Sequence, residues 1–170
     1  MKRIIVALIL VSVLLVTLVP VANAEMAKEG TSSATAIYSG TYKVMPLEKD
    51  TSVVTFEHTG VLTNDTGEGP LHNMSVHCVG FHYYEKGIAK QSMGYEVYTD
   101  PDGDKVLTEF TEPEYPSTAK VKKGTVKFLG GTGKFIGIEG ALEYIRYGVR
   151  PAVKGTYQGV SKGKGSWKIP

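Results

Sequence analysis

From about residue 36 onward, the sequence consists of short segments that favour β-strands. Val, Thr, Tyr and Phe are frequent there, and Gly, Pro, Asn and Asp interrupt the chain at short intervals. No segment carries a sustained apolar pattern with the period of a helix. The pattern predicts eight strands, the last two long enough to divide. They lie near Ala36–Val44, Val53–Leu62, Asn73–Tyr84, Ser92–Thr99, Lys105–Thr111, Gly124–Leu129, Phe135–Arg146 and Thr156–Ile169.

This succession of strands predicts a closed barrel. Eight consecutive antiparallel strands must bury one face and protect their edges, and barrel closure does both. Several glycines fall inside the predicted strands, where Gly is unfavourable unless a tight bend requires it, and small barrels need such bends. They are Gly60, Gly80, Gly94, Gly137 and Gly140. The expected fold class is therefore all-β, an eight-stranded antiparallel closed β-barrel.

The N-terminal segment has the three parts of a secretory signal peptide. Lys2 and Arg3 are positive, residues 4–19 are apolar and uncharged, and Ala22-Asn23-Ala24 forms a cleavage site. We expect cleavage after Ala24, a secreted or periplasmic location, and no stable membrane span in the mature protein. The small polar residues 25–34 predict a flexible N-terminus, followed by a single barrel domain over residues 35–170.

Charge and cysteine content exclude two classes of protein. Lys2 and Arg3 account for two of the 19 basic residues, which leaves 19 − 2 = 17 against 17 acidic ones in the mature chain. A nucleic-acid-binding protein normally has a basic excess, so we expect no nucleic-acid partner. The lone Cys78 excludes an intrachain disulfide and is best interpreted as a small buried hydrophobic residue.

Alternation within two strands predicts which side chains point into the barrel. Successive residues of a strand point to opposite faces, and the more apolar face belongs inside. The inward residues are Val54, Phe56, His58, Gly60 and Leu62 in one strand, and Met74, Val76, Cys78, Gly80 and His82 in the next.

These inward faces predict a ligand pocket, lined by His58, Cys78, His82, Glu96 and Tyr144. Glu96 and His58 are the candidates for catalysis, because an inward Glu beside Tyr or His can act as a general base or orient a polar ligand. A Glu96 that faces solvent fits the same sequence. Tyr144, Arg146 and Trp167 are candidates for the mouth of the barrel.

The glycine-rich stretch Gly130–Gly140 contains Lys134 but does not match a phosphate-binding loop. Such a loop requires a Gly five residues before its Gly-Lys pair and a Ser or Thr after it. Phe128 and Phe135 occupy these two positions. We therefore expect no nucleotide and no other cofactor. The stretch predicts a turn over residues 130–133, with the two phenylalanines as core anchors.

Two patterns resemble metal sites. Asp100, Asp102 and Asp104 alternate as in a calcium loop, but Gly103 stands at the fourth position rather than the sixth, so a hairpin turn is favoured and a cation remains an alternative. A zinc site made of His58, His82 and Cys78 would lack a closely spaced pair of ligands. We expect no metal.

The string Gly-Gly-Thr-Gly-Lys-Phe-Ile-Gly-Ile-Glu-Gly, residues 130–140, resembles a signature of allene oxide cyclase-like and dirigent-like barrels. A segment like residues 94–104 recurs in secreted bacterial members, and the resemblance covers residues 74–145. It implies a bacterial or archaeal secreted barrel with eight antiparallel strands, a central cavity and a homo-oligomer, a trimer or a dimer. Plant cyclases close an epoxide derived from a fatty acid, and dirigent proteins guide the coupling of phenoxy radicals. No plant catalytic residue matches a position here.

Three functional hypotheses follow. The leading one is a barrel that binds a small, mostly apolar molecule in its interior. The second is an isomerase or cyclase that acts on a fatty-acid-derived or phenolic substrate, with Glu96 or His58 polarising a substrate oxygen. The third is a filled barrel that serves as a non-catalytic interaction module.

Overall fold

The computed structural model describes residues 27–170, and the predicted signal peptide lies outside them. The strands of the barrel are β1 (Glu29–Glu48), β2 (Thr51–Asn64), β3 (Met74–Glu85), β4 (Ile88–Thr99), β5 (Lys105–Glu112), β7 (Val121–Gly131), β8 (Glu139–Val149) and β9 (Tyr157–Lys168). Two short elements complete the chain, the two-residue strand β6 (Tyr115–Pro116) and the 3-10 helix η1 (Gly133–Phe135).

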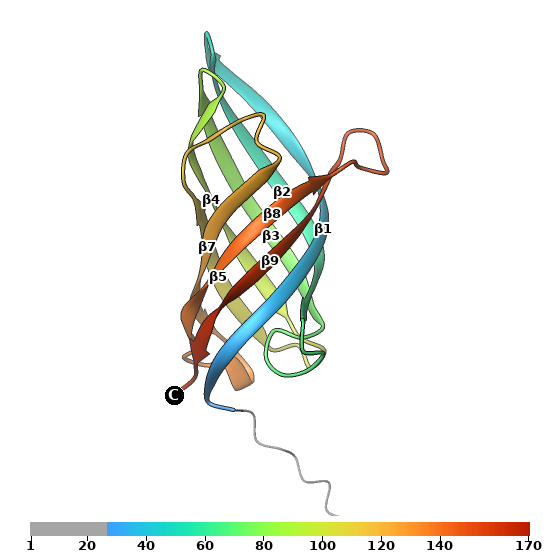
Figure 1. Ribbon diagram of the computed structural model, residues 1–170, viewed down its shortest axis with the longest axis vertical. Coiled ribbons are helices and arrows are strands. Elements are labelled where there is room, and N and C mark those ends of the chain that lie inside the picture. The colour runs from blue at the N-terminus through green and yellow to red at the C-terminus, as the bar shows by residue number, and fades with distance from the viewer. Residues whose placement is uncertain (1–26) are drawn as a thin grey trace, which may run out of the picture.

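The eight long strands form one closed antiparallel barrel (Figure 1). Each strand pairs with its neighbour in the chain, and β1 pairs with β9 to close the ring. The short strand β6 adds only two residue pairs, at the start of β4. The predicted fold class is therefore confirmed. Within residues 27–170, no helix has the length and apolarity to cross a membrane.

The predicted flexible segment over residues 25–34 is wrong from Glu29 onward. β1 begins there, and residues 29–34 pair with β9 from Lys168 back to Gly163. The composition of the segment is polar and small, but Ser32 and Ala34 are buried, at 4% and 2% exposure. The backbone pairing that closes the barrel orders this segment. The barrel therefore begins before residue 35.

The glycine-rich stretch is a turn, but the strand after it starts later than predicted. Phe135 lies in η1 rather than at the start of a strand, and β8 begins only at Glu139. Gly133 and Gly137 have φ angles of 53° and 77°, which a continuous strand does not adopt. Phe128 and Phe135 are 3% and 2% exposed, as expected of core anchors.

Lys134 connects this turn to the aspartate-rich turn between β4 and β5. Its Nζ atom lies 2.6 Å from Oδ2 of Asp102 and also pairs with the buried carboxylate of Asp100. Asp100 accepts hydrogen bonds from the backbone N–H groups of Asp102 and Asp104, which closes the predicted hairpin turn. The ammonium group of Lys134 thus supplies the positive charge that these carboxylates face.

Large apolar side chains fill the end of the barrel at which the glycine-rich turn lies. They come from the β2–β3 connection, the start of β3, the β7–β8 connection, and the end of β9 with the residue after it. All are at most 7% exposed: Leu71, Met74, Phe135, Ile138, Trp167 and Ile169. The β1–β2, β3–β4 and β8–β9 connections lie at the opposite end, which carries no comparable cluster of buried apolar residues in the part of the chain described. The interior is therefore accessible from that end.

Candidate functional site

The barrel encloses a cavity of about 440 Å³. Apolar side chains form much of its wall, namely Ala34, Ala36, Val54, Phe56, Leu62, Val76, Phe110, Val126 and Leu142. Polar or aromatic side chains form the rest, including Tyr38, His58, His82, Glu96, Tyr98, Lys122, Tyr144, Arg146 and Tyr157. Exposed residues at the end of β8 and in the β8–β9 connection, among them Val149 and Pro151, lie at the mouth.

The structure places four of the five predicted pocket residues on the cavity wall: His58, His82, Glu96 and Tyr144. Cys78 is buried at 1% exposure and is not among the residues that line the cavity. Alternation along β2 and β3 brings His58, Cys78 and His82 inward, because the inward face of each of these two strands is the apolar one. Of the three residues proposed for the mouth, Tyr144 and Arg146 line the cavity, whereas Trp167 lies in the apolar cluster at the closed end.

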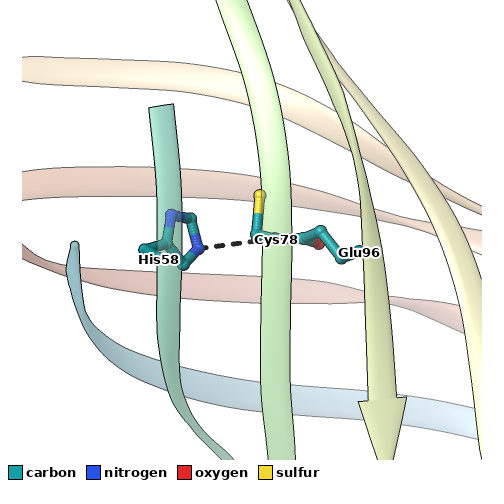
Figure 2. A group of neighbouring side chains, drawn as sticks. All are labelled: His58, Cys78 and Glu96. Carbon is teal, nitrogen blue, oxygen red and sulfur yellow. Dashed lines mark ion pairs between the residues drawn. The ribbon is translucent and has the colours of Figure 1, made fainter. Parts of the chain in front are cut away.

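Three polar residues form a row across neighbouring strands. His58 of β2 is the register partner of Cys78 of β3, which in turn is the partner of Glu96 of β4. Figure 2 shows the three side chains close together inside the barrel. His58 Nε2 lies 4.0 Å from Glu96 Oε1. The row brings together His58 and Glu96, which the sequence suggested separately, and not the His58–His82–Cys78 set that was considered for zinc.

One hydrogen bond and one stacked ring fix the imidazole of His58. Its Nδ1 atom lies 2.9 Å from the hydroxyl of Tyr157, and its ring stacks on Tyr38 with ring centroids 4.5 Å apart. Burial, with a smaller effect of Arg146, lowers the pKa of His58 to about 4. The imidazole is therefore neutral near pH 7.

Glu96 lies in a site that disfavours its charge. Burial raises the pKa of its carboxyl group and outweighs hydrogen bonds from Tyr98, Thr108 and Cys78, which favour the carboxylate. Its side chain is 13% exposed and lines the cavity. A protonated carboxyl group at this point can donate a hydrogen bond to an oxygen atom in the cavity.

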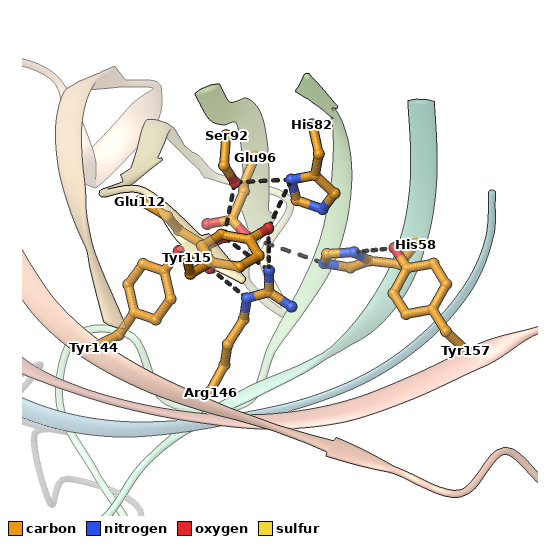
Figure 3. Close-up of polar contacts among 9 residues, drawn as sticks. All are labelled: His58, His82, Ser92, Glu96, Glu112, Tyr115, Tyr144, Arg146 and Tyr157. Atoms are coloured by element: carbon orange, nitrogen blue, oxygen red, sulfur yellow. Dashed lines mark hydrogen bonds and ion pairs between the residues drawn. The ribbon is translucent and has the colours of Figure 1, made fainter. Parts of the chain in front are cut away.

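A second network surrounds the buried carboxylate of Glu112 (Figure 3). Arg146 donates two hydrogen bonds to it, with Nη2 2.7 Å from Oε2. Ser92 and Tyr144 donate one each, at 2.7 and 2.9 Å. His82 extends the network, because its Nδ1 lies 2.8 Å from the Ser92 hydroxyl. Burial favours a higher pKa for Glu112, but Arg146 and the hydroxyl donors together hold the pKa at about 2.

Lys122 adds a second positive charge beside Arg146. The two residues are register partners on β7 and β8, and both line the cavity. Lys122 Nζ lies 4.3 Å above the ring of Tyr115. Burial, and then the charge of Arg146, lowers the pKa of Lys122 to about 8. Among the described residues Lys122 forms no ion pair, so this part of the wall has two cations and only the carboxylate of Glu112 to balance them.

Glu112, Tyr115 and Lys122 belong to the site although the sequence pattern did not predict them. Glu112 follows Val106, Thr108 and Phe110 at alternate positions of β5, so the period-two pattern contained a signal for it. Tyr115 belongs to a proline-containing connection and reaches the network through tertiary structure. The sequence around Tyr115 contains no pattern that indicates this.

The fold and cavity define a small closed antiparallel β-barrel with a hollow, mixed apolar and polar interior. No protein-family model matches the chain. No curated protein matches it either. Among solved structures, the chain is similar to the pterocarpan synthase dirigent protein GePTS1, with a TM-score of 0.48 and 12% sequence identity, over 89% of this chain and 95% of that one. The glycine-rich motif predicts membership of a particular barrel family, and that membership stays a prediction.

Proposed function

We propose that the protein binds a small, mostly apolar molecule that carries a polar group. The observation that supports this is the cavity of about 440 Å³ with a mainly apolar wall and a few fixed polar groups. Sites for small molecules typically have volumes of about 300–1,000 Å³ and this kind of lining. A hollow interior does not fit the hypothesis of a filled barrel.

The lining suggests how such a ligand would lie. Leu62, Val76 and Leu142 offer an apolar surface to the body of the molecule. Lys122 and Arg146 offer hydrogen-bond donors and positive charge to an oxygen-bearing group. Burying apolar surface contributes about 25 cal/mol per Å², so the apolar wall supplies most of the affinity and the polar groups select the orientation.

We expect the fluorescent probe 8-anilinonaphthalene-1-sulfonate to bind one site per chain, and Gly163→Met to weaken that binding at least about tenfold, or 1.4 kcal/mol. Gly163 lines the cavity, and a Cβ atom added there meets only ordinary contacts, the nearest 3.6 Å away at Leu142. The longer side chain therefore occupies ligand space with little strain on the backbone. Fluorescence titration measures the change.

Lys162→Met is the matched control, because Lys162 is the exposed neighbour of Gly163 on the same strand. It should leave the dissociation constant unchanged. Equal weakening in both variants, or none in Gly163→Met, would place the probe outside the cavity and contradict the proposal. Native mass spectrometry of the purified protein then identifies any molecule that stays bound.

A second candidate function is isomerisation or cyclisation in the same pocket. The observation that favours it is the carboxyl group of Glu96, which has a raised pKa and lines the cavity 4.0 Å from His58. A carboxyl group in its protonated form can polarise an epoxide or carbonyl oxygen of a substrate.

For this second function, Glu96→Gln should lower the turnover of an unsaturated fatty-acid epoxide by about 100-fold or more, because general acid–base groups contribute about 10²–10⁴ in rate. Glu109→Gln, on β5 and outside the cavity lining, serves as the control and should retain full turnover. Turnover that survives in Glu96→Gln would remove this residue from the chemistry. Product analysis by chromatography measures both rates.

A further inference from the structure

The row of His58, Cys78 and Glu96 brings three kinds of metal-binding atom to one level of the barrel. The imidazole nitrogen, the thiol sulfur and a carboxylate oxygen all lie within 4.8 Å of one another (Figure 2). Each residue comes from a different strand, and the strands are neighbours in register. Backbone pairing therefore sets the spacing of the three groups, which does not depend on a mobile loop.

Hydrogen bonds outside the row orient two of these groups. The hydroxyl of Tyr157, 2.9 Å from Nδ1 of His58, leaves Nε2 directed towards Glu96. Tyr98 donates to Oε2 of Glu96, which leaves Oε1 on the side of His58. Partners of this kind typically fix the orientation of metal ligands.

An ionised Glu96 would also lack a partner of the kind that Glu112 has. Arg146 neutralises Glu112 directly. Among the described residues, no Lys or Arg forms an ion pair with Glu96, and its one basic neighbour within 4.0 Å is the imidazole of His58. A carboxylate removed from water needs a compensating cation or a proton. A bound divalent cation would supply that compensation and would be shared with the thiolate.

We propose that His58, Cys78 and Glu96 form a binding site for Zn²⁺ or a divalent metal of similar preference. Nitrogen, sulfur and carboxylate oxygen are the ligands that zinc takes in proteins. Zinc–ligand bonds of about 2.0–2.3 Å place the ligand atoms of a tetrahedral site roughly 3.3–3.7 Å apart. The three ligand atoms lie within 4.8 Å of one another, so side-chain rotation has to bring them about 1 Å closer together. This proposal replaces the sequence-based expectation of no metal, and its third ligand is Glu96 rather than His82.

The position of the site gives it a further property. His58 and Glu96 both line the cavity, so the fourth coordination position faces the space in which a ligand would lie. Three protein ligands and one open position are typical of catalytic zinc sites, whereas structural sites have four protein ligands. The pocket would then hold an oxygen-bearing ligand at the metal. This inference goes beyond the proposed binding function and does not depend on which organic molecule is bound.

The test is a titration of the purified full chain, freed of metal by a chelator, with Co²⁺ alone. Cobalt bound to a thiolate gives a charge-transfer absorption band in the near ultraviolet. We expect this band to saturate at one equivalent and to disappear when Zn²⁺ displaces the cobalt. Cys78→Ser should abolish the band, and His58→Gln and Glu96→Gln should each weaken Co²⁺ affinity more than tenfold. Tyr157→Phe should weaken it about tenfold through the orientation of His58.

His77→Gln is the matched control. His77 precedes Cys78 on β3 but is exposed and pairs with Glu57 on the outer face of the barrel. It should leave the band and the affinity unchanged. The proposal would be overturned if the wild-type chain showed no absorption band. It would also be overturned if the His58 and Glu96 variants bound Co²⁺ as tightly as the wild type does. If Cys78→Ser fails to fold by circular dichroism, those two variants decide. Probe binding to the cavity is measured without metal, so either proposal can fail alone.

Discussion

Arg146→Met is expected to destabilise the barrel by about 3–5 kcal/mol at neutral pH, because it leaves a buried carboxylate without its cation. The Glu112 side chain is 0% exposed, and Arg146 donates two hydrogen bonds to it. Ser92 and Tyr144 would still donate to the carboxylate, but neither carries charge. Urea unfolding followed by circular dichroism at pH 7 measures the loss.

The loss should depend on pH in a defined direction. In the wild-type protein, the pKa of Glu112 lies near 2, below its ordinary value of 4.5. Its contribution to stability is therefore complete above pH 4.5 and is lost as the pH falls towards 2. In Arg146→Met the carboxyl group keeps its burial but loses the cation, so its pKa rises. The difference between the two proteins should therefore shrink in acid.

Two further variants separate charge from packing. Glu112→Gln combined with Arg146→Met removes both charges, and we expect it to recover much of the stability lost in the single variant. Lys90→Met removes an exposed ion pair with Glu114 and should change the urea midpoint little. An Arg146→Met protein as stable as Lys90→Met, or equally destabilised at pH 3 and pH 7, would contradict the account of the buried pair.

Phe135→Ala is expected to cost about 3–5 kcal/mol, the usual range for removing a buried phenylalanine. Phe135 is 2% exposed and belongs to the apolar cluster at the closed end of the barrel. The backbone of the 3-10 helix fixes its position, with Phe135 N–H donating to Thr132 O at 3.0 Å. Neighbouring side chains cannot fill the space without moving this turn. Thermal and urea unfolding measure the change.

Ile136→Ala is the matched control, because Ile136 is the next residue and is 66% exposed. We expect its effect to lie within about 0.5 kcal/mol, as for most surface substitutions. If the two variants were equally stable, Phe135 would not anchor the closed end. If Ile136→Ala were the more damaging, the exposed side chain would have to be covered by another molecule in solution.

The strand pattern and inward faces were predictable because they depend on a local property, the alternation of side chains along each strand. Val54, Phe56 and Leu62 line the cavity on the face where the alternation placed them. The start of β1 was not predictable in the same way. Residues 29–34 have a composition typical of a flexible segment, and they form a strand because β9, over 100 residues away in the chain, pairs with them.

The candidate site was predictable residue by residue but not as an arrangement. Alternation suggested that His58 and Cys78 point inward. The sequence around each residue does not indicate that they are register partners in one row with Glu96. The pairing of Glu112 with Arg146 spans 34 residues and three strands, and it depends on how the barrel closes. Lys134 shows both sides. The residues around Gly133 were enough to argue against a phosphate-binding loop, but nothing local indicated that the partners of Lys134 are carboxylates of another turn.

The pairing of β1 with β9 has a consequence for how the molecule is made. Ile169 N–H donates to Lys28 O at 2.6 Å, so the contacts at this seam join the first described residues to the last ones. Contacts between such distant parts of a chain form late and slowly, since the whole intervening loop must close first. A ribosome that has released only part of the chain therefore holds an open sheet with two unpaired edges. The interior becomes an enclosed compartment only after β9 has been made and has paired with β1.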